Sequence, residues 1–385
     1  MQFNKIKLKD IADINMGQSP SGSSYNNNGR GIPFLQGNKT FGFLYPTIDT
    51  WTTEPKKIGK KNSVLMSVRA PVGDLNIANK DICIGRGLCS IEMKNGNNQF
   101  LYYLMKNSIK KIKMKSTGTV FESINRKELK NIEILDFDKS QQKKISKILF
   151  DIDKKIELNI QTNDNLYKIL EQYIKEHYYN NEFVRNGNVN DIGKIQGGYA
   201  FKSKDLLNET TNNKVLKIKN ISASGVDIDN TQCVYDEVAD KVDKKFLLLR
   251  GNVIIAMTGA ELGKTGYLYG QDYRYFLNQR VGVIRGNDKY SELYLNCLFL
   301  LKDMQNTLNS KGYGSAQPNI STSDIENIEI PIPKEDELET FYEKCNPIYS
   351  KMILNSEQNQ SLTQLRDSLL PKLMNGEIDL DKIEI

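Results

Sequence analysis

The chain is poor in the residues that build metal and redox centres. Its 385 residues include one histidine, one tryptophan and five cysteines, and no two cysteines form a CxxC pair. Metal cages need clustered ligands and histidine-based catalysis needs a histidine beside a nucleophile, but His177 stands alone near the expected end of a helix. We therefore expect no metal site and no catalytic residues, and we expect the chain itself to bind no cofactor.

Long apolar runs are also missing. No run approaches the roughly 18 apolar residues that a membrane span needs, and the opening MQFNKIKLKDIADI lacks the apolar core of a signal peptide. The hydrophobic fraction of 39% is enough for folded domains, and the length exceeds one ordinary core. These features predict a soluble, cytoplasmic protein of two domains with no membrane partner.

Positive charge is unevenly distributed along the chain. The net charge is +6, but residues 1–140 hold 22 Lys and Arg against 12 Asp and Glu, whereas residues 335–385 hold 5 against 11. A basic surface suits a polyanion such as nucleic acid. A lysine-rich, solvated surface without such a partner is the alternative, and charge alone does not decide between them.

The most informative feature is an internal repeat. The segment GTVFESINRKELKNIEI, from Gly118, returns 196 residues later, from Gly314, as GSAQPNISTSDIENIEI, and that offset then holds through a long helical stretch. Upstream, the offset falls to 189 between Val64 and Val253. Each half therefore repeats one order of turn-rich loops, strands, a helix, a strand ending in IEI and a long helix. This pattern predicts one structural plan, present twice, that carries two surfaces with different side chains.

The long helices carry the seam of a coiled coil, because apolar and asparagine residues recur at alternating spacings of four and three. In the first copy the seam is Ile145, Leu149, Ile152, Ile156, Asn159, Asn163, Leu166, Leu170 and Tyr173. In the second copy it is Phe341, Cys345, Ile348, Met352, Asn355, Asn359, Leu362, Arg366 and Leu369. Asparagines at the same two places in both copies are expected to fix the register of the pair.

The repeat predicts an α+β fold of two homologous domains held apart by two long antiparallel coiled-coil helices, related by a pseudo-two-fold axis. We expect a first domain over 1–137, a central spacer helix over 138–182, a second domain over 183–334 and a C-terminal spacer helix and tail over 335–385. Shorter helices are expected at 98–115 and 291–310. Pro347, opposite Asp151, predicts a break in each spacer helix, followed by about 26 residues or ~40 Å of helix.

The segment TGAELGKTG at 258–266 is the closest match to a phosphate-binding loop. Such a loop needs a glycine where this chain has Thr258, and a helix where GYLYGQDYRYFLN follows with the pattern of strand and turn. We therefore expect a tight turn between strands, as for RAPVG at 69–73 in the first copy. A nucleotide-binding enzyme using this segment is the alternative from a different class.

Polar residues in the loops of both halves are of the kind that reads nucleic acid. Asn and Gln pair with adenine, Arg and Lys pair with guanine, and Ser, Thr and Lys contact phosphates. The candidates in the first half are Gln18, Ser19, Ser23, Arg30, Gln36, Asn38, Lys39, Arg69 and Arg86. Those in the second half are Lys202, Ser203, Lys217, Lys219, Asn220, Lys264, Asn278, Gln279, Arg280, Tyr313 and Gln317. A surface or turn role is the alternative for each of them.

Several motifs recur in a fixed order. They are the openings DIADINMGQSP at 10–20 and DIGKIQGGYAF at 191–201, RAPVG at 69–73, the paired GxxxxxI segments leading into IEI, and the closing SLLPKLMNGEIDL at 368–380. In this order they resemble the specificity subunits of type I restriction–modification systems over essentially all 385 residues.

The resemblance implies two target-recognition domains that each read one half of a split sequence in double-stranded DNA. It implies that this chain is not catalytic. Methyltransferase subunits docked on the spacer helices would bind S-adenosylmethionine and flip out the target adenine, and restriction subunits would use ATP to translocate and cut. The specificity partner of a related bifunctional restriction enzyme is the alternative within the same biology.

Overall fold

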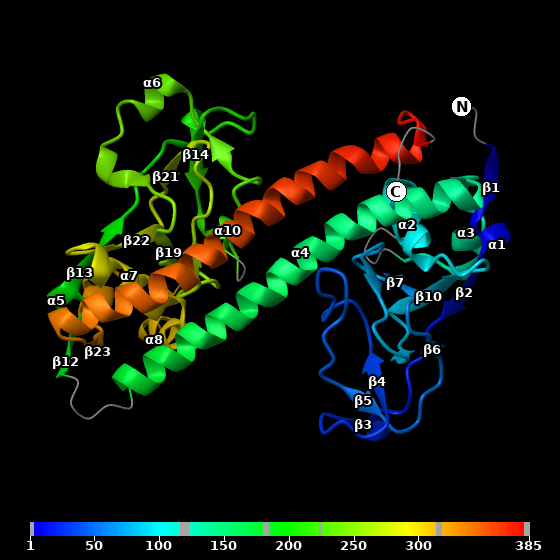
Figure 1. The fold of residues 1–385 in the computed structure, drawn as a ribbon, viewed down its shortest axis with the longest axis horizontal. Helices are drawn as coiled ribbons and strands as arrows, with labels where there is room; N and C mark the ends of the chain where they lie inside the picture. The colour runs from blue at the N-terminus through cyan, green and yellow to red at the C-terminus, as the bar shows by residue number, and fades with distance from the viewer. Residues whose placement is uncertain (1–3, 116–122, 180–184, 223–224, 313–317, 381–385) are drawn as a thin grey trace. The chain divides into compact units, whose positions relative to one another are not determined.

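The structure, a computed structural model, describes residues 4–115, 123–179, 185–222, 225–312 and 318–380. The chain divides into two compact units, Met1–Glu157 with Ser361–Ile385 and Leu158–Gln360. Each unit combines sheets with parts of both long helices, α4 and α10 (Figure 1). The mixed α+β architecture predicted from the sequence is therefore present in each unit.

The first unit is built on an antiparallel sheet with strand order β2-β10-β7-β8. A second sheet has the order β3-β5-β4-β9-β6, and β1 pairs with β11. The strands are β1 (Lys5–Lys7), β2 (Ala12–Met16), β3 (Tyr25–Asn26), β4 (Ile32–Leu35), β5 (Trp51–Thr52), β6 (Ile58–Gly59), β7 (Val64–Ser67), β8 (Leu75–Ile77), β9 (Ile82–Ile84), β10 (Leu88–Met93) and β11 (Glu133–Leu135). The shorter helices are α1 (Leu8–Ile11), α2 (Asn98–Lys115) and α3 (Arg126–Lys130).

The second unit repeats this plan with strand order β13-β22-β19-β20, a second sheet β17-β14-β21-β18 and the pairs β12-β23 and β15-β16. Its strands are β12 (Arg185–Asn188), β13 (Gly193–Gly197), β14 (Asn213–Leu216), β15 (Ile221–Ser222), β16 (Gly225–Val226), β17 (Gln232–Cys233), β18 (Leu247–Leu248), β19 (Val253–Ala256), β20 (Thr265–Tyr267), β21 (Arg274–Leu277), β22 (Val281–Gly286) and β23 (Glu329–Ile332). The shorter helices are α5 (Val189–Ile192), α6 (Asp236–Ala239), α7 (Lys289–Leu300), α8 (Lys302–Lys311) and α9 (Thr322–Glu326).

The apolar runs at β7 and β19 form strands that are buried on both faces. Val64 and Met66 join the hydrophobic cluster around α2, whereas Leu65 joins the cluster of the second sheet. In the second unit, Val253 and Ile254 divide in the same way between the cluster around α7 and that of the second sheet. Because successive side chains of a strand point to opposite faces, a continuous apolar run is what such a strand needs.

The helix predicted at 98–115 is confirmed as α2, but the single helix predicted at 291–310 is wrong. Leu301 has extended backbone and separates α7 from α8. The Tyr167 hydroxyl donates to the Leu300 carbonyl at 3.3 Å and accepts the Lys302 N–H at 3.2 Å, and Gln305 Nε2 also donates to Leu300 at 3.0 Å. These bonds satisfy the backbone groups that the break leaves without helical partners.

The two spacer helices are continuous over more residues than predicted. Helix α4 spans Lys139–Ile174 and ends in a π-helical turn at Lys175–Tyr179, and α10 spans Glu335–Met374. Their 36 and 40 residues correspond to roughly 54 Å and 60 Å of helix.

The predicted breaks at Asp151 and Pro347 are therefore wrong. A proline inside a helix costs about 3 kcal/mol. On either side of Pro347, however, the side chains of Phe341 and Met352 are 0% and 4% exposed, and burial of each such side chain gains about 1.5–3 kcal/mol. Glu343, whose carbonyl loses its helical partner, lies on the exposed side, where water can bond to it. Packing thus outweighs the local preference of the proline.

Within the second unit, the seam asparagines of α4 and α10 face one another. Asn159 Nδ2 donates to Asn359 Oδ1 at 2.8 Å, and Asn355 Nδ2 donates to Asn163 Oδ1 at 2.8 Å. Asn163 Nδ2 also donates to the Met352 carbonyl at 3.0 Å. Because rising numbers on α4 pair with falling numbers on α10, the helices are antiparallel here. Buried amides that satisfy each other fix the register, since a shift would leave them unpaired.

The other predicted seam residues also lie on the inner sides of the helices. Buried are Ile145, Leu149, Ile156, Leu170, Phe341, Cys345, Met352 and Arg366. Partly buried are Ile152, Leu166, Tyr173, Ile348, Leu362 and Leu369.

Candidate nucleic-acid interface

Three segments of the first unit meet where β2 ends, where β4 ends and where a turn joins β9 to β10. The Gln18 N–H donates to the Ile84 carbonyl at 2.9 Å, and the Gly85 N–H donates to the Leu35 carbonyl at 2.8 Å. A Cβ on Gly85 would come within 2.9 Å of the Gln36 backbone, so glycine allows this close approach. The fold thus holds three turns together by backbone contacts.

The Ser19 hydroxyl links the three turns by hydrogen bonds. Ser19 Oγ donates to Gln36 Oε1 at 2.9 Å and accepts the Arg86 N–H at 3.2 Å. The Gln36 and Arg86 side chains are exposed. Four candidates, Gln18, Ser19, Gln36 and Arg86, are therefore brought together, and we name them the first reading group. An exposed amide and an exposed guanidinium suit the edges of adenine and guanine.

Asn38 and Arg69 lie beside the first reading group. Asn38 Nδ2 donates to Asp74 Oδ2 at 2.6 Å, which ties the segment after β4 to the hairpin between β7 and β8. The Val68 N–H donates to the Gly87 carbonyl at 2.9 Å and so places Arg69 next to the β9–β10 turn.

Ser23 and Arg30 are not part of this group. The Arg30 N–H donates to Asn26 Oδ1 at 2.9 Å and closes the turn between β3 and β4, at the opposite end of β4 from Gln36. Ser23 bonds to Ser21 at 2.8 Å in the segment before β3. Lys39 is exposed in the loop after β4.

The second unit builds the same meeting of three turns with different side chains. The Tyr199 N–H donates to the Leu277 carbonyl at 2.9 Å, and the Asn278 N–H donates to the Leu216 carbonyl at 3.1 Å. The turn between β21 and β22 carries Gln279 and Arg280, which are exposed. We name Lys217, Asn278, Gln279 and Arg280 the second reading group.

Lys217 follows β14 as Gln36 follows β4, but its ammonium group is partly buried and hydrogen-bonded. Its Nζ donates to Gln232 Oε1. Burial, followed by the nearby charge of Lys219, lowers the pKa of the Lys217 ammonium. Lys219, like Lys202 and Ser203, is exposed on the neighbouring loops.

Asn220 is buried, at 1% exposure, so the structure gives it a role inside its loop instead of on the surface. Its Nδ2 donates to the carbonyls of Asp227 and Asn230, at 3.2 and 3.0 Å, and its Oδ1 accepts the Lys217 N–H at 3.0 Å. The sequence alone could not show this, because an asparagine in a polar loop has the same neighbouring residues whether its side chain faces inward or faces solvent. The candidates Tyr313 and Gln317 lie outside the described residues.

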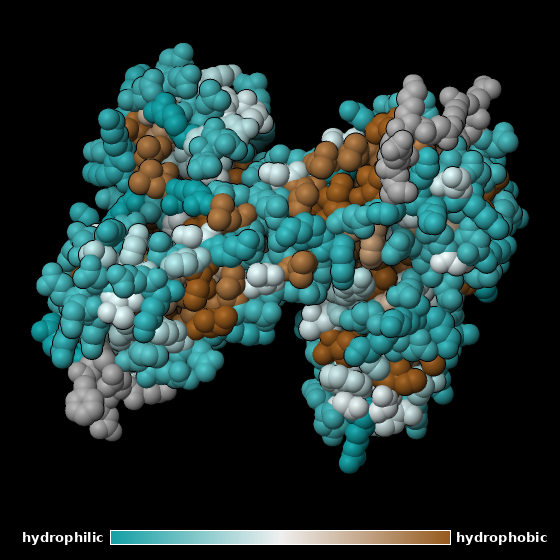
Figure 2. All heavy atoms as spheres, viewed as in Figure 1, coloured by the Kyte–Doolittle hydropathy of each residue, from teal (hydrophilic) through white to brown (hydrophobic). Residues whose placement is uncertain are grey.

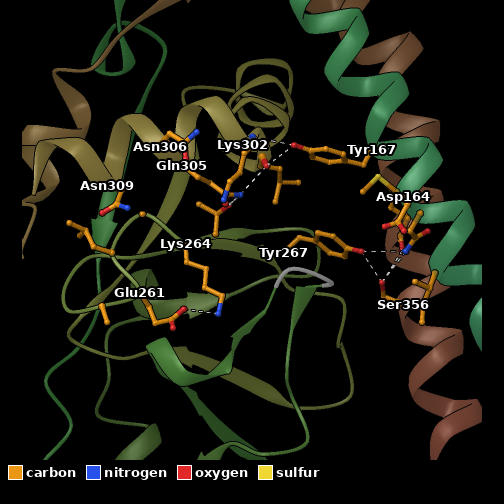
Figure 3. Close-up of a pocket in the computed structure, with 18 of the residues that line it drawn as sticks. Asp164, Tyr167, Glu261, Lys264, Tyr267, Lys302, Gln305, Asn306, Asn309 and Ser356 are labelled. Atoms are coloured by element: carbon orange, nitrogen blue, oxygen red, sulfur yellow. Dashed lines mark hydrogen bonds and ion pairs between the residues drawn. The ribbon is translucent and has the colours of Figure 1, made fainter. Parts of the chain in front are cut away.

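The TGAELGKTG segment forms a turn between β19 and β20, and the chain continues as strand at Thr265–Tyr267. Lys264 Nζ lies 2.7 Å from Glu261 Oε2, and the two side chains point toward each other in Figure 3. The turn lines a cavity of about 550 Å³ whose opposite wall is formed by α4 and α10. There the hydroxyls of Tyr267 and Ser356 lie 2.8 Å apart (Figure 3). A strand after the turn does not provide the helix N-terminus that supports phosphates in a nucleotide-binding loop.

Each long helix also exposes two large apolar side chains outside the seam. Leu158 and Ile169 on α4 are 53% and 51% exposed, and Leu354 and Leu365 on α10 are 51% and 47% exposed. Brown, hydrophobic residues are visible along α10 among teal ones in Figure 2. The two pairs are related by the 196-residue offset, and eleven residues, or three turns, place the members of a pair on one side of their helix.

We name these pairs the α4 face and the α10 face. Sequence reasoning missed them because it followed only the seam. The signal was present, since both copies keep an apolar residue at each of these two positions.

Two further properties concern the part of the chain that the structure describes. Its His, Cys, Asp and Glu side chains form no group of three or more that could hold a metal ion. None of its helices combines the length and apolar character that a membrane span requires.

The units thus define a class of protein in which a duplicated sheet domain presents three converging turns and is carried on paired antiparallel helices. The family model of the type I restriction modification DNA specificity domain matches residues 2–168 and again residues 181–364. The chain therefore belongs to this family, as a DNA-recognition subunit of the type I restriction–modification kind.

Similar proteins agree with this assignment. The MjaIX specificity subunit of a type I restriction enzyme from Methanocaldococcus jannaschii is 28% identical over 98% of this chain and 94% of its own length. The putative MjaX specificity subunit from the same organism is 42% identical over 40% of this chain and 37% of its own length. The crystal structure of a type I restriction–modification system S subunit from M. genitalium has the same fold, with a TM-score of 0.63 and 19% identity over 97% of this chain and 96% of that one.

Proposed function

We propose that this chain reads a split DNA sequence with its two reading groups and has no catalytic role of its own. The observation that carries the proposal is that the same three-turn geometry is built twice, with Gln36 and Arg86 in one unit and Gln279 and Arg280 in the other. Domains over 1–137 and 183–334 would each contact one half of the target. Shared backbone contacts with different exposed side chains suit two readers of different bases.

The test of this proposal is the pattern of methylated adenines in a host that carries the gene with its neighbours. Long-read sequencing should show one split motif, and deletion of this gene should abolish it. Methylation that persists after the deletion would contradict the proposal, and so would methyl transfer by the purified chain alone.

Single substitutions in the two reading groups should affect separate halves of the motif. Arg86→Ala removes a guanidinium and should relax one position of the first half, with a loss of about 1–3 kcal/mol of discrimination. Arg280→Ala should act in the same way on the other half only. Methylation at sites with single mismatches, measured by sequencing, distinguishes the halves.

Arg30→Ala is the matched control, because Arg30 lies at the other end of β4 from Gln36. It should leave base preference unchanged. If Arg86→Ala altered both halves, the assignment of one half to each reading group would be wrong.

We further propose that methyltransferase subunits dock on the α4 face and the α10 face. Each face offers two exposed apolar side chains that an apolar interface could cover, and their repetition at a constant offset suits two copies of one partner. S-adenosylmethionine and ATP would be bound by the methyltransferase and restriction subunits, in the cytoplasm where the chromosome is available to them.

The paired helices should set the length of the unread gap between the half-sites. Insertion of seven residues after Asn163 and seven between Leu354 and Asn355, which face the same level of the antiparallel pair, adds one heptad to each helix and keeps the seam in register. Each heptad adds about 10 Å of helix, so the gap in the methylated motif should grow by about three base pairs. A gap of unchanged length in a fully active variant would remove the spacer role from the helices.

The control is the same heptad placed in only one helix. It leaves the seam residues on one side of the insertion out of register with the partner helix and should reduce the stability of the chain.

A further inference from the structure

A buried charged network occupies the helix pair of the first unit. Arg366 Nη1 lies 2.7 Å from Asp153 Oδ1, and the Tyr103 hydroxyl donates to Asp153 Oδ2 at 2.8 Å. The side chains of Asp153 and Arg366 are 0% and 6% exposed. Arg366 Nε also donates to Asp367 Oδ1 at 2.8 Å, and its guanidinium lies 5.8 Å from the Phe43 ring.

The equivalent positions of the second unit, at the 196-residue offset, carry no charge. Tyr349 replaces Asp153, and Leu170 stands where the other copy has Arg366. Both are buried, at 4% and 2% exposure. The Tyr349 hydroxyl donates to the Gly251 carbonyl at 2.6 Å, so this layer is satisfied without an ion pair. One copy of the duplicated layer is charged and the other is neutral.

The asparagine layers differ from this layer because they are the same in both copies. If α4 paired with α4 of a second chain in the same antiparallel register, Asn159 would still meet an asparagine, the other chain's copy of Asn163. Asp153, however, would meet Leu170, and in a pair of α10 helices Arg366 would meet Tyr349. Each like pairing buries a charge without its partner, which is strongly unfavourable.

We propose that the network of Tyr103, Asp153 and Arg366 selects the partner of each long helix. It favours pairing of α4 with α10 over pairing of α4 with another α4, whereas the asparagines set the register of any pairing. A duplicated chain needs such a selector, because its two halves otherwise present nearly the same seam to each other and to a second copy. The inference concerns assembly and does not depend on the proposed DNA contacts.

The experiment uses the folded full chain with a protease site placed between Tyr179 and Arg185. Cutting it yields an N-terminal and a C-terminal piece that remain associated, and mild denaturant then allows the pieces to exchange. Native mass spectrometry distinguishes mixed pairs from pairs of like pieces. The wild-type chain should return mixed pairs only.

Copying Tyr349 and Leu170 of the second unit into the first, as Asp153→Tyr and Arg366→Leu, together with Tyr103→Phe to remove the hydroxyl that bonds to Asp153, should let like pairs appear, toward a statistical mixture of mixed and like pairs. As a control, Asn159→Leu with Asn355→Leu changes equivalent positions of both copies and should leave the preference for mixed pairs unchanged. The proposal is overturned if the wild-type pieces form like pairs freely, or if the triple variant still forms mixed pairs only.

A charge exchange keeps the proposal testable if the triple variant fails to fold. Asp153→Arg with Arg366→Asp should retain mixed pairs. When pieces from the two single variants are combined, the Asp153→Arg N-terminal piece should prefer the Arg366→Asp C-terminal piece over the wild-type one by on the order of a hundredfold. Equal binding of both C-terminal pieces would overturn the proposal.

Discussion

A chain with Leu158→Glu and Ile169→Glu should bind one methyltransferase subunit instead of the two expected from the proposed docking on the α4 face and the α10 face. Both side chains are about half exposed, so the substitutions leave the core of the second unit intact. In a complex, however, each would bury a carboxylate in an apolar interface, at a cost of several kcal/mol. Two such groups should weaken binding more than a thousandfold. Mass photometry of the purified complex should show one partner subunit, against the two expected for the wild-type chain.

The same change on the other helix provides an internal comparison. Leu354→Glu with Leu365→Glu should remove the other partner, and all four substitutions together should abolish methylation in cells. Leu249→Glu is the matched control, because Leu249 is also apolar and 63% exposed but does not belong to either helix. If the variant with all four substitutions still bound two methyltransferase subunits, the two faces would be excluded as docking sites.

Removal of one charge from the buried network should destabilise the first unit by about 3–5 kcal/mol. Asp153→Leu leaves the Arg366 guanidinium buried without its partner, and Arg366→Leu leaves the Asp153 carboxylate with only the Tyr103 hydroxyl. The free energy of unfolding from urea titration measures the loss. The double substitution to leucine should recover most of it, because a neutral pair no longer carries an unpaired charge.

Tyr349→Phe in the second unit is the comparison for this series. It removes one hydrogen bond, to the Gly251 carbonyl, and should cost only about 1 kcal/mol. If either single substitution at Asp153 or Arg366 cost no more than this one, the ion pair would not be held in a low-dielectric environment.

Many of the strands and helices could be predicted from the sequence, because they depend on local patterns or recur at a constant residue offset. The continuous apolar runs at Val64 and Val253 form β7 and β19, the 98–115 helix is present over its whole predicted length, and the seam asparagines meet as their spacing indicates. The constant offset of 196 residues also predicts that both units share one plan. These features depend on the periodicity of residue types, which can be read from the amino-acid sequence without knowledge of the fold.

The tertiary structure alone decided the features that depend on contacts between distant segments. Helix α10 continues through Pro347 because its neighbours are buried, and the 291–310 region breaks at Leu301 because Tyr167 of α4 bonds to the backbone on both sides. Asn220 turns inward although its local sequence resembles that of an exposed loop. A local preference is worth a few kcal/mol at most, so packing and hydrogen bonds from elsewhere in the fold can reverse it.

The candidate site divides in the same way. Residue types in the loops indicated nucleic-acid contacts, but only the fold shows that Ser19, Gln36 and Arg86, up to 67 residues apart, form one group while Arg30 does not. The charged layer at Asp153 and Arg366 was equally hidden, because the pairing of two residues that lie 213 positions apart in the chain is a property of the fold. The sequence determined that two similar units exist, and the tertiary contacts decided how each of them differs.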